Sequence, residues 1–422
     1  MFPRSRLFWA VSLGHLTNDT FMSMGPVLLA FISASILPLR VTEIGVILGV
    51  TALLGAVTQP FFGWLADQGS GRLLGAGGVA WTVGWMLVGI AAADRGLAWL
   101  MVPAFIIPAL GSGAFHPVGS MWAASEKGRA ASSLSYFFLM GQLGLGLGPA
   151  LAGLLLSSAG GGSLFAQALG PAFGARLIER GTVAPVLATG LLALPVIALM
   201  AFTIPSRRAH RAARAAAPAP AARTIIPART LALLVLMVAL RSLAQPGSVN
   251  FIPVLFQARG WSPAEYGLIT SSFWLAAGLA GVGFGLLADR FDRRRVIAAS
   301  LLLSAPTFFL LPTATGAAAF GLAIAAGAFS GGSHSIIVVM AQGLLPGSKG
   351  LASGAILGLI FGMGAVGNFL IGAASQAIGL DATFQLVAGA IAAAGALALA
   401  LPAAHPQPPP LPAEVETAPA AV

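Results

Sequence analysis

The chain has 422 residues, of which 57% are hydrophobic and only 8% are charged, and its formal net charge at pH 7 is +10. A soluble domain needs about 25% charged residues to cover its surface, so this composition excludes a protein that folds in water. Cysteine is absent, which excludes disulfides, thiolate metal sites and a cysteine nucleophile. The basic residues are spread over short loops and form no single basic face, so we expect no nucleic-acid partner.

Long apolar runs recur from one end of the chain to the other, and each can cross about 30 Å of hydrocarbon. The first run follows Arg4 and Arg6 and exceeds the roughly 7–15 apolar residues of a secretory signal, so we interpret it as a retained membrane span. In chain order, the runs predict twelve spans at residues 7–33, 43–66, 73–93, 97–123, 130–157, 182–204, 229–256, 264–287, 296–313, 317–344, 351–376 and 382–402.

Threading these spans alternately across a bilayer separates the basic residues unequally. One side receives most of them, whereas the other receives only Arg40, Arg95, Arg176, Arg180 and Arg259. The positive-inside rule makes the first side cytoplasmic, so both termini are expected there. We therefore expect a multi-pass protein of the bacterial inner (plasma) membrane.

An internal repeat divides the chain into two bundles. Residues 1–204 form the expected N-terminal six-helix bundle, 205–228 a cytoplasmic linker, 229–402 the C-terminal six-helix bundle, and 403–422 a tail with no periodic apolar face. The sequence Gly63-Trp64-Leu65-Ala66-Asp67 returns 222 residues later as Gly285-Leu286-Leu287-Ala288-Asp289. Such a repeat predicts two structurally related halves.

Several of these motifs resemble those of a known family. The loop from Gly63 to Arg72 resembles the loop motif of the major facilitator superfamily, and Gly285 to Arg295 is a fuller second copy. The segments His15-Leu16-Thr17-Asn18-Asp19, Phe115-His116-Pro117 and Ala341 to Gly347 resemble the fosmidomycin-resistance branch of that superfamily. The resemblance implies an all-α membrane protein with twelve transmembrane helices in two pseudo-symmetric halves and a substrate site at the midplane between them.

Ionisable residues inside the spans are candidates for function, because each costs about 2.5–3.5 kcal/mol at the centre of a membrane helix. His15 and Asp19 are four residues apart, so they lie on one face of the first helix with Asn18 beside them. A proton can pass between two groups at this spacing. We predict that Asp19, with His15, couples transport to protons.

The repeat also aligns Asp19 with Arg241, at equivalent depths in the first and seventh spans. In the fold that the resemblance implies, these spans line the central cavity. We predict that Asp19 pairs with Arg241 or with its own neighbours in one access state, and that Arg241 attracts an anionic substrate with help from Asn18, His116 and His334. The alternative is a static ion pair that only holds the two halves in register.

His116 precedes Pro117, which removes a helical hydrogen bond and disfavours helical geometry at His116. A kink there would leave polar backbone beside an imidazole that titrates near neutral pH. Binding or proton relay is one interpretation. The alternative is a histidine that bonds to the freed Gly113 carbonyl at a purely structural kink.

The resemblance implies that the two loop copies act as gating latches. The gating candidates are Asp67, Arg72, Asp289, Arg290 and Arg293. A solvated turn with topology-setting charge is the alternative. The fifth span carries Gly144, Gly148, Pro149 and Gly153, which resembles the glycine-proline pattern of antiporters in the superfamily. Small residues permit close helix contact, and proline fixes a bend.

No nucleotide-binding loop, zinc-binding His/Glu spacing or nucleophile elbow is present in a suitable context, so we predict no enzyme, no catalytic residue, no metal site and no cofactor. The predicted function is a proton-coupled efflux antiporter of a small drug or organic anion, and the resemblance implies export of fosmidomycin or a similar compound. Its expected partners are a small-molecule substrate, protons and the lipid bilayer, with the chain as a monomer. Organic-anion uptake by proton symport and a non-transporting sensor or scaffold are the alternatives.

Overall fold

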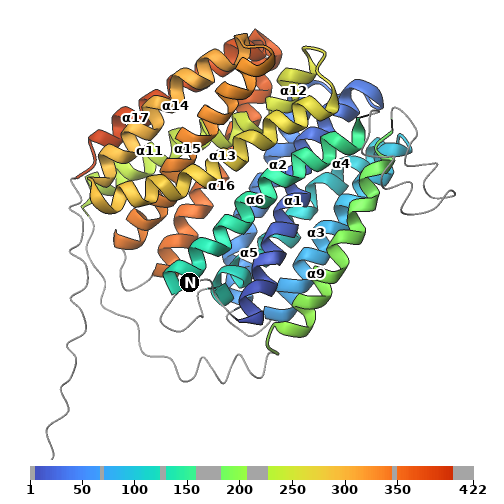
Figure 1. The fold of residues 1–422 in the computed structure, drawn as a ribbon, viewed down its shortest axis with the longest axis horizontal. Helices are drawn as coiled ribbons and strands as arrows, with labels where there is room; N and C mark the ends of the chain where they lie inside the picture. Colours follow the sequence, from blue (N-terminus) through green and yellow to red (C-terminus); the bar gives the residue numbers. More distant parts are fainter. Residues whose placement is uncertain are drawn as a thin grey trace, which may run out of the picture.

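The computed structural model describes residues 5–66, 71–123, 130–157, 182–206, 227–344 and 349–402. Within the helices, the side chains of residues 130–132, 134–135, 246, 289, 335, 338–339, 341–344 and 349–356 lie outside this description. In the described ranges, every regular element is a helix (Figure 1).

The helices of the first half of the chain are α1 (Arg6–Ser35), α2 (Val41–Leu65), α3 (Gly71–Asp94), α4 (Ala98–Ile106), α5 (Pro108–Ala123), α6 (Ala130–Leu156), the short 3-10 helix η2 (Ala184–Thr189) and α9 (Gly190–Thr203). Those of the second half are α11 (Ala228–Val249), α12 (Ile252–Gln257), α13 (Pro263–Arg290), α14 (Arg293–Leu310), the 3-10 helix η3 (Leu311–Thr313), α15 (Gly316–Leu344), α16 (Lys349–Ile378) and α17 (Leu380–Leu399).

These elements confirm the twelve predicted spans, since each span coincides with one helix or with two consecutive ones. Eleven helical segments of the described chain are long and apolar enough to cross a membrane. The short helix α12 and the long helix α1 are outside that set; α1 has 30 residues but carries polar residues at its centre. The seventh span differs from the prediction, because it breaks between α11 and α12, where Pro253 lies in the first turn of α12 and has no backbone N–H for a continuous helix.

Local sequence explains where several helices begin. The Ser5 hydroxyl accepts a hydrogen bond from the Phe8 backbone N–H at the start of α1. At the start of α13, Ser262 and Glu265 form a capping box, in which each side chain bonds the other residue's backbone N–H. Asp292 caps α14 by accepting from the Arg294 N–H. These caps satisfy backbone donors that a helix end would otherwise leave unpaired.

The two halves lie side by side, with α1 to α9 in one group and α11 to α17 in the other (Figure 1). Two pairs of long helices join them, α2 with α16 and α6 with α13. In each half these are the second and fifth spans, so the interface follows the sequence repeat. Most buried hydrophobic side chains of the described chain form one cluster that includes residues of both halves, from Phe8 to Leu401. A smaller cluster in the first half consists of Ala66, Leu74, Ala114 and Val118.

Glycines bring the two halves into close contact near the start of α2 and near the start of α13. An added Cβ on Gly45 of α2 would lie 3.0 Å from the Cα of Gly372 on α16. An added Cβ on Gly267 of α13 would lie 2.9 Å from the Cα of Gly153 on α6. We call this the closed side, because backbone packs against backbone there. Towards the opposite end of α13, a Cβ on Gly283 would meet nothing within 4 Å.

This packing predicts that Gly267→Ala loosens the closed side, because the new methyl group has only backbone to displace. Since the chain contains no cysteine, Ser271→Cys provides a single reporter one turn away at a buried position. We expect a water-soluble maleimide to label this reporter several-fold faster in the Gly267→Ala background. Gly283→Ala on the same helix is the matched control and should leave the rate unchanged; equal rates in both variants would contradict the prediction.

Candidate functional site

The carboxylate of Asp19 lies between two imidazoles inside the first half of the molecule. His15, one turn earlier on α1, places its Nε2 atom 3.2 Å from Asp19 Oδ2. His116, on α5, places its Nε2 atom 3.4 Å from the other oxygen, Oδ1. No lysine or arginine of the described residues lies within ion-pair distance of Asp19. The only groups that can neutralise this carboxylate here are themselves titratable.

The outer nitrogen of each ring is held by the backbone. The Nδ1 atom of His15 lies 2.8 Å from the Phe137 carbonyl oxygen, and that of His116 lies 2.8 Å from the Ser112 carbonyl oxygen. Because a carbonyl oxygen only accepts hydrogen bonds, Nδ1 carries a proton in both rings. Both Nε2 atoms are therefore the exchangeable positions, and both face Asp19.

The partner of His116 corrects one of the two sequence interpretations. The expected structural partner was the carbonyl of Gly113, but the ring bonds to the carbonyl of Ser112, and α5 continues through Pro117. The Ser112 hydroxyl lies a further 3.3 Å from the same ring nitrogen. His116 thus points its free nitrogen at Asp19, and its side chain keeps 22% exposure.

Asn18 ties three helices together around the carboxylate. Its amide nitrogen donates to Asp19 Oδ1 and to the Ser112 hydroxyl, each at 3.0 Å. Its carbonyl oxygen accepts from the Thr82 hydroxyl of α3, also at 3.0 Å. Asn18 is completely buried, so these bonds replace contacts with water. Sequence analysis placed Asn18 at the site but missed Thr82 and Ser112, because small hydroxyl residues are common in membrane helices and carry no distinguishing signal.

Aromatic rings and glycines of α6 shape the space around His15. The His15 ring stacks on Phe137 with a centroid distance of 4.1 Å and an interplanar angle of 24°. An added Cβ on Gly141 would overlap the His15 ring, and one on Gly144 would lie 3.1 Å from the Asp19 Cβ. These glycines let α6 approach α1 closely enough for the stacking. Gly144 therefore borders the site itself, in addition to belonging to the predicted antiporter-type pattern.

The other members of that pattern divide between two contacts. Gly148 packs on α1, where an added Cβ would collide with Thr20 and Ser23. Pro149 and Gly153 face the second half, and an added Cβ on Gly267 would collide with the Pro149 carbonyl oxygen and approach Gly153. The pattern thus places one part of α6 against the site and the other part against the closed side of the interface.

Arg241 occupies the corresponding position in the second half. It is only 2% exposed, and its Nε donates to the Ser333 hydroxyl of α15 at 3.2 Å. Its Nη1 atom is buried and has no hydrogen-bond partner among the residues that the structure describes, and His334 lies within electrostatic range of its charge. The predicted direct pairing of Asp19 with Arg241 is not formed in this structure, since both side chains are described and no ion pair joins them. Asp19 instead pairs with its own neighbours.

Comparison with known proteins identifies the family. A family model described as Major Facilitator Superfamily matches residues 234–422. The chain is 30% identical over 390 residues to the uncharacterized MFS-type transporter YfnC of Bacillus subtilis (strain 168), which covers 90% of this chain and 88% of that protein. The chain belongs to the major facilitator superfamily. It is accordingly a multi-pass membrane transporter.

Two further similarities support the family and the fold. The chain is 26% identical over 382 residues to the fosmidomycin resistance protein of Escherichia coli (strain K12), covering 90% of this chain and 88% of that protein. Among solved structures, a bacterial homolog of the human lysosomal transporter Spinster, in an inward-facing and occupied conformation, has a TM-score of 0.71 at 16% identity. That alignment covers 93% of this chain and 96% of the Spinster homolog, and at this identity it shows the fold alone.

The gating candidates of this major facilitator are only partly described. Asp67 and the side chain of Asp289 lie outside the described residues. Arg72, at the start of α3, donates from Nε to the Ile204 carbonyl at 2.9 Å and so ties α3 to the end of α9. In the second copy, Arg290 is exposed and Arg293 begins α14.

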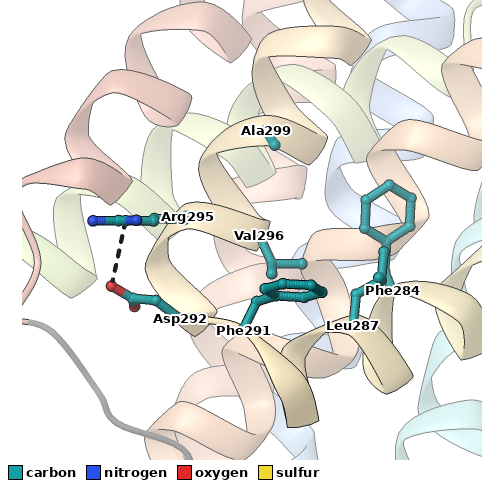
Figure 2. Close-up of a pocket in the computed structure, with 7 residues that line it drawn as sticks. All are labelled: Phe284, Leu287, Phe291, Asp292, Arg295, Val296 and Ala299. Atoms are coloured by element: carbon teal, nitrogen blue, oxygen red, sulfur yellow. Dashed lines mark ion pairs between the residues drawn. The ribbon is translucent and has the colours of Figure 1, made fainter.

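A shallow pocket of about 270 Å³ lies where α13 meets α14, beside this second loop copy (Figure 2). Its lining consists of Phe284, Leu287, Phe291, Asp292, Arg295, Val296 and Ala299. Figure 2 shows Asp292 and Arg295 paired at one edge, at 3.9 Å, with the aromatic and aliphatic side chains beside them. The sequence did not indicate this pocket. The lining residues lie towards the facing ends of α13 and α14, and they include none of the residues that surround Asp19.

The Asn18 network predicts a measurable contribution to stability. Asn18→Leu keeps the branching of the side chain but removes three hydrogen bonds, and in membrane proteins each such bond contributes about 0.6 kcal/mol on average. We expect a loss of about 2 kcal/mol, seen as a lower midpoint when tryptophan fluorescence follows thermal unfolding in detergent. Ser33→Ala on the same helix, which removes only a local bond to the Ala30 carbonyl, is the control. Equal midpoints for both variants would contradict a structural role for the network.

Proposed function

We propose that this transporter is a proton-coupled efflux antiporter of a small drug or organic anion, working by alternating access. The observation that carries the proposal is the position of Asp19 between His15 and His116, with no permanently charged partner in the described chain. A carboxylate neutralised only by imidazoles changes the charge of the transporter interior whenever a proton arrives or leaves. A structural ion pair with arginine would not respond in this way.

The backbone contacts of the two rings support this role. Since each Nδ1 donates to a carbonyl, the rings are oriented and proton exchange is confined to the Nε2 atoms and the carboxylate. The side chains of Asp19 and His116 keep 11% and 22% exposure, so packing within the bundle does not seal them completely. A net charge at membrane depth is costly, so the protonation state biases which conformation is favoured.

The second half supplies the complementary charge. Arg241 is buried, and no group of the described residues accepts a hydrogen bond from its Nη1. A buried guanidinium group is strongly stabilised by an anion, because leaving it unpaired costs the desolvation of a charged group. The Ser333 hydroxyl bonds its Nε atom, and His334 lies within electrostatic range of its charge. The proposal is that Arg241 binds the acidic group of the substrate while Asp19 and its histidines load protons.

The direction and the substrate rest on similarity. The fosmidomycin resistance protein of Escherichia coli is a relative of moderate identity, and the glycine-proline pattern of α6 is of the antiporter type. We infer export across the bacterial inner membrane, with both termini in the cytoplasm. In this orientation the closed side of the interface is periplasmic. Periplasmic protons then bind at Asp19 when that side opens and drive the release of substrate outward.

Asp19→Asn should abolish transport that is driven by a pH gradient, because an amide cannot exchange a proton. The measurement is uptake of fosmidomycin into inside-out vesicles with an imposed pH gradient. We expect at least a tenfold loss of gradient-driven flux with retention of substrate exchange in the absence of a gradient. Asp381→Asn is the matched control, since that carboxylate is 61% exposed and pairs with Arg259 outside the site. Undiminished gradient-driven flux in Asp19→Asn would refute proton coupling here. Uptake into energised right-side-out vesicles would refute export.

Arg241→Gln should weaken substrate binding by about tenfold or more, since a hydrogen bond to a charged group contributes about 1.5–3 kcal/mol. The change should appear in KM, because Arg241 is proposed to bind substrate and not protons. The double variant Asp19→Asn with Arg241→Gln should not regain gradient-driven flux, because the two residues form no ion pair in this structure. Recovery of flux in the double variant would instead support a static pair that holds the two halves in register.

A further inference from the structure

Three ligand atoms converge inside the first half of the transporter. The side chains of His15, Asp19 and His116 each offer one nitrogen or oxygen, and these atoms all lie within 4.8 Å of one another. Two imidazole nitrogens and a carboxylate oxygen are donors preferred by divalent ions of the zinc class, whereas Mg²⁺ and Ca²⁺ prefer oxygen alone. We propose that His15, Asp19 and His116 form a binding site for one divalent transition-metal ion, namely Zn²⁺, Co²⁺ or Ni²⁺.

The spacing of the donors fits such an ion. With metal–ligand bonds of about 2.0–2.1 Å in a tetrahedral arrangement, two ligand atoms lie roughly 3.3 Å apart. The Nε2 atoms of His15 and His116 lie 3.2 and 3.4 Å from the nearest oxygens of Asp19. The carboxylate presents a different oxygen to each ring, so a small rotation of its plane decides between one-oxygen and two-oxygen coordination.

The surrounding hydrogen bonds resemble the outer shell of a metal site. A metal-binding histidine usually donates its other ring N–H to a carbonyl or carboxylate, which fixes the tautomer and aims the lone pair at the ion. Both rings do so, through the carbonyls of Phe137 and Ser112. The carboxylate of Asp19 is itself held by the Asn18 amide at 3.0 Å. A histidine that only packed against its neighbours would not require its Nε2 atom to point at the carboxylate.

The charge of the site suits a divalent ion. With both Nε2 atoms protonated, two imidazolium groups and one carboxylate give one net positive charge. A divalent ion bound by two neutral imidazoles and the same carboxylate also gives one net positive charge. The ion therefore replaces two protons without adding charge at membrane depth, where additional charge is costly. Metal and protons compete for the same three side chains.

The open coordination position and the surroundings of the remaining histidine complete the case. Three protein ligands leave a fourth position for water, as in zinc sites that are not purely structural, and the His116 side chain keeps 22% exposure. The remaining histidine of the described chain, His334, is half-buried and lies within electrostatic range of the Arg241 charge. A second cation would be repelled there, which makes His334 a matched internal control.

The test is binding of Co²⁺ to the purified full-length protein in detergent, carrying a non-histidine affinity tag. Of the five histidines, His210 and His405 lie outside the described residues and are replaced by alanine in every variant. We expect one equivalent of Co²⁺ with the intense visible absorption of a tetrahedral ion, displaced by Zn²⁺ but not by Mg²⁺. His15→Ala and His116→Ala should weaken binding at least about tenfold, and Asn18→Ala by about 10–100-fold. His334→Ala should bind like the parent protein.

The proposal is overturned if His15→Ala and His116→Ala bind Co²⁺ as tightly as the parent, or if the bound ion shows only the weak octahedral spectrum of hydrated Co²⁺. Gel filtration and tryptophan fluorescence establish that each variant is folded, and His116→Gln provides a conservative second variant should His116→Ala unfold. The readout is metal binding and involves no transport. It can therefore fail while proton coupling holds, and succeed while proton coupling fails.

Discussion

The structure depends on one buried carboxylate that has no permanent counter-charge. Asp19 lies inside the first half of the transporter, and its partners in the described chain are His15, His116 and the amide of Asn18. Each imidazole is oriented from behind by a backbone carbonyl, so its free nitrogen points at the carboxylate. The glycines of α6 permit this arrangement, because a larger residue at Gly141 would occupy the space of the His15 ring. The close packing of α6 on α1, the tautomers of the two histidines and the charge of Asp19 therefore depend on one another.

At the same position of the repeat, the two halves of the molecule carry side chains of opposite charge. The first and fourth spans of the N-terminal half bring an acid and two histidines together, whereas the seventh and tenth spans bring an arginine, a serine and a histidine together. Neither charge neutralises the other directly, so each remains available to a mobile ion or a substrate. This difference between the halves supports the proposed coupling of an anion to protons, and no static ion pair between Asp19 and Arg241 is formed in this structure.

The glycine contacts connect the site to the conformation of the whole bundle. Helix α6 carries Gly141 and Gly144 beside the site and Gly153 at the closed side, where it meets Gly267 of α13. Both points therefore lie on the same helix, on either side of Pro149. The pairs α6 with α13 and α2 with α16 are the surfaces on which the halves meet, and backbone-to-backbone packing there can separate and close again without rearranging large side chains.

The amino-acid sequence alone determined the number, order and approximate bounds of the spans, because hydrocarbon tolerates only long apolar segments whose backbone bonds internally. It also determined that His15, Asn18 and Asp19 share one region of a helix, since that follows from the helical period. Only the tertiary structure decided that His116 faces Asp19, that Thr82 and Ser112 complete the network, and that Arg241 bonds Ser333 and not Asp19. The reason is physical: local spacing specifies which residues share a helix face, but the rotation of each helix and the choice of its neighbour result from packing over the whole bundle.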